Sequence, residues 1–127
     1  MKRCAFLLAL VAALTLPGSA SAAPKLPGEY TTKIASPSPY QGTWMLTFTK
    51  AHAYAVAFKD QTLVLGTWAA QGSRLTLSRE KGPLACGFPG TYTWKRSGKA
   101  LTLTKVSDSQ AACVGRAVVL GHRFKVA

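Results

Sequence analysis

The ionisable side chains that hydrolytic or metal chemistry would use are few in this sequence. Beyond the N-terminal segment they comprise four carboxylates and two histidines, spread along the chain: Glu29, Asp60, Glu80, Asp108, His52 and His122. Acid–base or nucleophilic catalysis needs paired groups held close together, and a metal site needs three or more ligands. No G-x-S-x-G or H-E-x-x-H motif supplies such an arrangement. We therefore expect no enzyme activity, no metal site and no cofactor.

The histidines and several aromatic residues are instead candidates for a binding site inside the fold. Counting along expected strands in steps of two puts His52 on the same face as Tyr54, and His122 on the same face as Phe124. The candidates for the interior are His52, Tyr54, Trp68, Tyr92, Trp94 and His122. They line a ligand cavity or fill the interior as core, because a small barrel is narrow enough for side chains alone to pack it. The sequence leaves both possibilities open.

Residues 1–22 have the features of a secretory signal peptide. Lys2 and Arg3 precede an apolar run that ends in the small residues Ala20-Ser21-Ala22. The run is too short for a stable membrane span. We expect cleavage after Ala22 and a secreted or periplasmic protein that is not integral to the membrane.

The remaining chain is small and basic. Removing residues 1–22 from the 127-residue chain leaves 105 residues, and the loss of Lys2 and Arg3 lowers the formal net charge from +12 to +10. A basic protein favours anionic macromolecules or acidic protein faces as partners. The basic residues form no run, so we do not expect nucleic acid to be the partner.

Two cysteines remain after cleavage, Cys86 and Cys113. Export takes them to an oxidising compartment, where an isolated pair is expected to form a disulfide. In the chain-entropy model, a loop of this length contributes roughly 3.5 kcal/mol to stability.

The pattern of apolar residues predicts an all-β fold. Residues 23–40 are rich in proline and serine and read as an arm with at most one short strand at 29–34, so we place the folded domain at 41–127. Within it apolar residues alternate with a period of two. Expected strands cover residues 42–49, 53–58, 62–68, 74–79, 91–96, 100–106 and 116–126, with one helical turn at 108–113. About eight short sequential strands favour an up-and-down antiparallel barrel, because closure removes exposed edges.

Gly42-Thr43-Trp44, at the start of the first long strand, resembles the G-x-W signature of the lipocalins and their calycin relatives. In that family the tryptophan closes one end of the barrel beneath an arginine from the last strand. The resemblance implies that Trp44 lies under Arg116 and that the barrel binds a small apolar ligand. The chain is shorter than a typical lipocalin and is also similar to secreted protease-inhibitor barrels, which act through their rim or N-terminal arm. A ligand-binding barrel and a macromolecular interaction protein are thus the two hypotheses.

Overall fold

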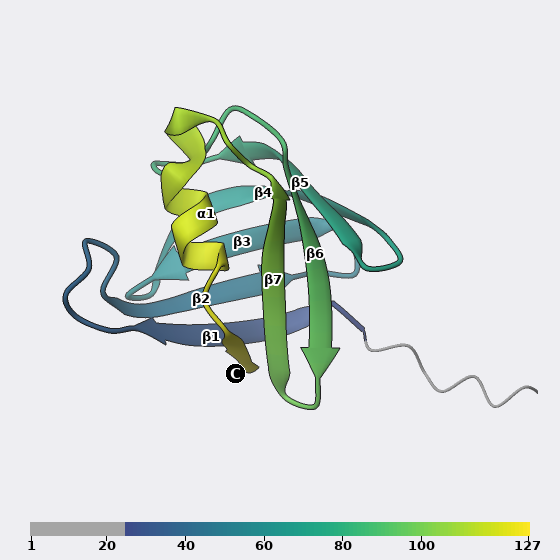
Figure 1. The fold of residues 1–127 in the computed structure, drawn as a ribbon, viewed down its shortest axis with the longest axis horizontal. Coiled ribbons are helices and arrows are strands. Elements are labelled where there is room, and N and C mark those ends of the chain that lie inside the picture. Colours follow the sequence, from purple (N-terminus) through teal and green to yellow (C-terminus); the bar gives the residue numbers. More distant parts are fainter. Residues whose placement is uncertain (1–24) are drawn as a thin grey trace, which may run out of the picture.

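The computed structural model describes residues 25–127, so the expected signal peptide lies outside the described part. Eight antiparallel strands follow one another around a closed barrel (Figure 1). They are β1 (Gly28–Ile34), β2 (Gly42–Phe48), β3 (Ala53–Phe58), β4 (Gln61–Gln71), β5 (Arg74–Lys81), β6 (Gly90–Ser97), β7 (Ala100–Ser107) and β8 (Phe124–Val126). The predicted all-β up-and-down barrel is confirmed.

The strands form where the apolar period is two. In β2, Trp44, Leu46 and Phe48 are buried while the residues between them are at least partly exposed. Short turns join most of the strands, such as Gly72 in the β4–β5 hairpin and Gly98 in the β6–β7 hairpin, both with positive φ. The buried faces of the strands meet in one apolar core inside the barrel.

The barrel begins earlier than the sequence suggests. The short strand allowed for at 29–34 is present as β1, but it belongs to the barrel: it pairs with β2 along its whole length and with β8 through Tyr30 and Thr31. Leu26, just before it, is 2% exposed. The prolines of this segment lie outside β1 and do not interrupt its hydrogen bonds.

The prediction of a long final strand at 116–126 is wrong. The chain forms the 3-10 helix η1 (Ala111–Cys113) and the α-helix α1 (Val114–Leu120), and only Phe124–Val126 is strand. Asp108 also does not cap the helical turn, because η1 has no side-chain cap. Valines favour a strand locally, but Val119 and Leu120 are adjacent and both buried on the inner face of α1, whereas a barrel strand would direct one of them outward.

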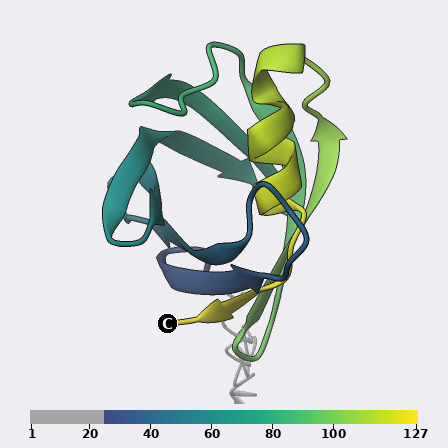
Figure 2. The same cartoon turned by 90° about the vertical axis from the view of Figure 1, so that its left-hand side faces the viewer.

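The barrel has two unlike ends. Helix α1 lies across one of them, beside β7, and we call this the cap end (Figure 2). The opposite end carries the turns at Thr49–His52, Gln71–Arg74 and Ser97–Ala100, and we call it the turn end. Within residues 25–127 no helix is long and apolar enough to cross a membrane.

Candidate functional site at the cap end

A cavity of about 400 Å³ lies at the cap end, between the barrel and α1, and we call it the cap cavity. Its lining comes from the inner face of β2–β4, including Val56 and Val64, from the loop that contains Pro83 to Cys86, and from residues 111–120. Tyr40, before β2, and Glu80, on β5, complete it. Leu84 and Val114 in its lining are each 54% exposed. The cavity therefore reaches the surface between the loop and the start of α1.

The polar part of the lining belongs to a buried cluster around Arg116, which we call the arginine cluster: Tyr54, Glu80, Tyr92, Asp108 and Arg116. Arg116 donates to both oxygens of Asp108, from Nε at 2.8 Å and from Nη2 at 2.6 Å, and to Glu80 Oε2 from Nη1 at 2.8 Å. The side chains of Arg116, Glu80 and Asp108 are 7%, 1% and 0% exposed. A guanidinium fork held by a carboxylate is among the stronger charge-assisted arrangements.

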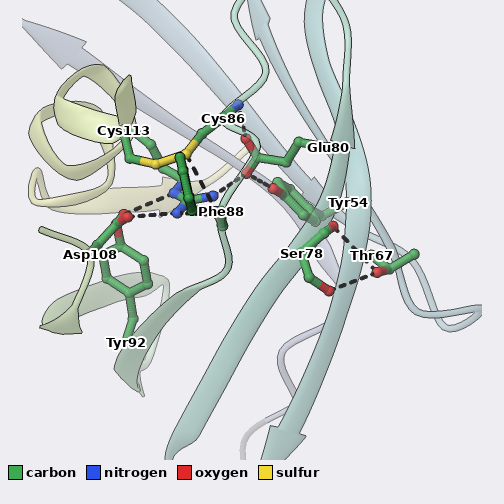
Figure 3. Close-up of polar contacts among 10 residues, drawn as sticks. Tyr54, Thr67, Ser78, Glu80, Cys86, Phe88, Tyr92, Asp108 and Cys113 are labelled. Carbon is green, nitrogen blue, oxygen red and sulfur yellow. Dashed lines mark hydrogen bonds and ion pairs between the residues drawn. A yellow bond between two sulfur atoms is a disulfide. The ribbon is translucent and has the colours of Figure 1, made fainter. Parts of the chain in front are cut away.

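Two tyrosines complete the cluster. The hydroxyl of Tyr54 donates to Glu80 Oε2 and that of Tyr92 donates to Asp108 Oδ2 (Figure 3). Each carboxylate thus receives a neutral donor besides the guanidinium. The cluster holds one positive and two negative groups and carries a net charge of about −1 when all three are ionised.

Burial and these contacts shift the pKa values of the two tyrosines and of Arg116. Burial raises the pKa of Tyr54 and of Tyr92 well above the usual 10.0, and the hydrogen bonds to Glu80 and Asp108 raise it further. Burial alone would lower the pKa of Arg116, but its bonds to Asp108 and Glu80 outweigh this and raise it. The tyrosines are therefore neutral donors, and Arg116 is a permanent cation.

A β-bulge turns Glu80 inward. The pairing of β4 with β5 shifts so that Leu65 lies opposite Lys81 and Thr67 opposite Ser78, which leaves two residues facing Gly66. Arg79 within this step has a φ of 53°. Leu75 and Leu77 point inward, so strict alternation would put Arg79 inside and Glu80 outside; the extra residue reverses this.

Two glycines make room for the cluster. A Cβ on Gly66 would lie 2.5 Å from the ring of Tyr54, its partner across β3 and β4. A Cβ on Gly90 would lie 2.6 Å from Nη2 of Arg116. Neither position can carry a side chain, because a Cβ atom would occupy the space that the tyrosine ring or the guanidinium needs to reach the carboxylates.

The disulfide joins the loop after β5 to η1, beside the arginine cluster. Cys86 and Cys113 are bonded, with their Cα atoms 5.2 Å apart, as the sequence predicts. The amide of Cys86 donates to Glu80 Oε1 at 2.8 Å, and Arg116 donates from Nη2 to the carbonyl of Phe88 at 2.9 Å. The loop after β5 and the start of α1 are thereby fastened to the same buried ions.

Trp44 is buried at the cap end, but the expected partnership with Arg116 is wrong. The indole of Trp44 packs on Phe58, with ring centroids 4.7 Å apart, and donates to the carbonyl of Tyr40 at 2.7 Å. Arg116 lies on α1 and is held by the carboxylates instead. Gly42 has a φ of 125°, and a Cβ there would lie 2.7 Å from the ring of Phe58, which explains the glycine of Gly-x-Trp.

The six interior candidates separate into three groups. Tyr54 and Tyr92 are buried in the arginine cluster, and of the six only Tyr54 lines the cap cavity. Trp68 and Trp94 pack against the core at the turn end. These two indoles donate to the carbonyls of Thr49 and Gly72, both at 3.0 Å.

The histidines do not form the interior pair that strand parity suggests. His52 is exposed in the turn before β3, with its ring centroid 4.7 Å from that of Trp68. His122 is half-buried in the link between α1 and β8. His122 does not follow strand alternation because the preceding segment is helical, and His52 does not because its φ of 63° takes it out of the strand.

Sequence reasoning missed Glu80 and Asp108 as the partners of Arg116. One signal was present: Cys113, Arg116 and Leu120 recur at intervals of three and four residues, which is a helical spacing. Nothing comparable marks Glu80, whose inward position depends on the bulge.

The described residues also bear on other kinds of site. Residues 25–127 contain no group of three or more histidine, cysteine, aspartate or glutamate side chains placed to hold a metal. A second hollow, of about 430 Å³, lies beside β6 and β7 and is lined by Thr93, Lys95 and Thr102 among others. Of the described residues that line it, Trp94 is the only large apolar one, so this hollow offers a ligand less apolar burial than the cap cavity does.

Comparisons with protein-family models, with curated proteins and with solved structures found no match to this chain. The closed eight-stranded antiparallel barrel is compatible with a calycin-like fold.

Proposed function

We propose that this is a non-enzymatic, secreted or periplasmic binding protein that holds a small, largely apolar molecule in the cap cavity. The observation that carries the proposal is a cavity of about 400 Å³ with a mainly apolar lining that reaches the surface. Small-molecule sites in proteins have volumes of roughly 300–1,000 Å³ and combine apolar walls with a few fixed polar groups. The cap cavity is at the small end of that range.

The composition of the wall supports binding without catalysis. Each carboxylate near the cavity is held by Arg116 and by a tyrosine hydroxyl. A group engaged in this way is poorly placed to act as a general base, which needs an accessible lone pair directed at the substrate. The disulfide is compatible with an oxidising compartment.

The first experiment is native mass spectrometry of the mature protein, exported and purified without denaturation. A retained small molecule, released on unfolding, is the expected result. A co-purified protein in its place would favour the alternative of a macromolecular interaction protein. That alternative has one observation in its favour: Leu84, Phe88 and Val114 at the cap end are each about half exposed.

A cavity-blocking variant makes the test specific. Ala112 lines the cap cavity from η1 and is exposed, so Ala112→Trp places a large ring in the opening without removing a core side chain. We expect it to abolish binding of the neutral fluorescent probe N-phenyl-1-naphthylamine. Ala69→Trp, at an exposed position of β4 outside the cavity lining, is the matched control and should bind the probe as wild type does. Equal binding by Ala112→Trp and wild type would contradict the proposal.

A further inference from the structure

We infer that the cap cavity selects uncharged or cationic molecules and rejects anionic ones, although the protein as a whole is strongly basic. This inference rests on the proposed binding function and names the chemical class of the ligand. It is carried by the charges in and directly behind the cavity wall.

The charged groups in the wall and directly behind it have an excess of negative charge. Among the described residues, Glu80 and Arg116 are the charged residues that line the cavity, and no lysine does. Asp108, 0% exposed, is bonded through both oxygens to the far side of the same guanidinium. The single cation is thus outnumbered by two carboxylates, and a ligand in the cavity faces a net charge of about −1.

The guanidinium of Arg116 is also not available for a bidentate contact with a ligand carboxylate. Nε and Nη2 of Arg116 are engaged by Asp108, and Nη2 also by the carbonyl of Phe88. Nη1 donates to Glu80. A ligand carboxylate would have to displace a buried protein carboxylate to obtain the bidentate geometry that makes arginine an anion receptor.

The basic surface does not compensate inside the cavity. At physiological ionic strength the field of exposed charges decays over about 8 Å, whereas charges buried in the protein are screened much less. The net charge of +10 after cleavage therefore acts on how anions approach the molecule, and the arginine cluster acts on what the cavity retains.

Three ligands of one shape test the inference: 2-naphthalenemethanol, 2-naphthylmethylammonium and 2-naphthoate. Their dissociation constants are measured by isothermal titration calorimetry at pH 7 with the mature protein. We expect the alcohol and the ammonium ion to bind at least about tenfold more tightly than the carboxylate, because like charges several ångströms apart in a partly buried site repel by an amount of that order. Equal or tighter binding of the naphthoate would overturn the inference.

Two variants separate the possible outcomes. Ala112→Trp identifies binding inside the cavity, so naphthoate that still binds this variant is held on the basic surface and does not count against the inference. Glu80→Gln removes one negative charge from the wall, and we expect it to reduce the preference against the carboxylate to within about threefold.

If Glu80→Gln fails to fold, the affinities of the three ligands for the wild-type protein decide alone. If none of the three ligands binds, the proposed function fails and the inference with it; if all bind in the cavity without charge preference, only the inference fails.

Discussion

The two ends of the barrel are closed by different kinds of interaction. At the turn end, Trp68 and Trp94 pack on the core, and each indole N–H bonds to the carbonyl of a neighbouring turn. At the cap end, Trp44 packs on Phe58, but the arginine cluster, α1 and the disulfide complete the closure. Aromatic rings fill volume as they close an end, whereas ions joined by hydrogen bonds fix positions without filling the space around them. A cavity of about 400 Å³ remains at the cap end.

The largest difference between the two ends should appear when an arginine is removed from each. Arg116→Met leaves Glu80 and Asp108 buried without a counter-ion, which costs about 3–5 kcal/mol of unfolding free energy. Arg96, at the turn end, lies over the ring of Tyr30 and bonds to the carbonyl of Lys25 in a half-buried position. Arg96→Met should cost about 1 kcal/mol.

Urea unfolding of both variants measures this comparison. Arg116→Lys, which keeps the charge but loses the fork, should be intermediate and remains informative if Arg116→Met does not fold. Similar losses for Arg116→Met and Arg96→Met would mean that the ion cluster is not what holds the cap end.

The disulfide should have the next largest effect on global stability, and its removal should in addition let the cap end open locally. The double variant Cys86→Ser, Cys113→Ser is expected to lose about 3–4 kcal/mol of unfolding free energy, because the reduced chain gains loop entropy when unfolded. Hydrogen exchange should accelerate at the amides of α1 much more than at the β6–β7 hairpin. Uniform acceleration across the barrel would show that the bond stabilises the whole fold without a special role at the cap end.

Alkaline pH should lower the unfolding free energy through the two buried tyrosines of the cap end. The pKa values of Tyr54 and Tyr92 are raised in the folded state, so their contribution to stability is complete below pH 10.0 and is lost as the pH rises above it. The unfolding free energy should fall by about 1.4 kcal/mol per pH unit for each tyrosine that ionises only in the unfolded chain. Urea titrations from pH 8 to 11, with tyrosinate absorbance at 295 nm, measure this. A Tyr92→Phe variant should show a shallower decline; stability unchanged up to pH 11 would contradict the buried-tyrosine account.

A smaller effect distinguishes two glycines of the cap end. Gly90→Ala places a methyl group 2.6 Å from Arg116 Nη2 and should cost about 1–3 kcal/mol. Gly87 has open space around it and no strained backbone angle, so Gly87→Ala should change the unfolding free energy by less than about 0.5 kcal/mol. Thermal unfolding of the two variants side by side decides the point, and equal melting temperatures would argue against close packing of Arg116 on the β6 backbone.

The barrel itself was accessible from the sequence because its signals are local. The alternation of apolar residues in β2 to β7 and the glycines at tight turns are visible within a few residues of sequence. The pairing of Cys86 with Cys113 needs only a count of the cysteines beyond the expected signal peptide. Eight short sequential strands then leave few arrangements without exposed edges. The disulfide between Cys86 and Cys113 followed from the same reasoning.

The site depended on contacts that no local pattern records. Val114–Leu120 has the composition of a strand, yet it is helical where Arg116 meets Glu80 and Asp108, which are 36 and 8 residues away in sequence. Glu80 turns inward only through the bulge at Arg79, and a single inserted residue reverses which face every later side chain occupies. The sequence alone therefore determined the class of fold and its covalent closure. Tertiary structure decided which charges meet in the interior and where space is left between them, because the stability of a buried ion depends on partners brought from distant parts of the chain.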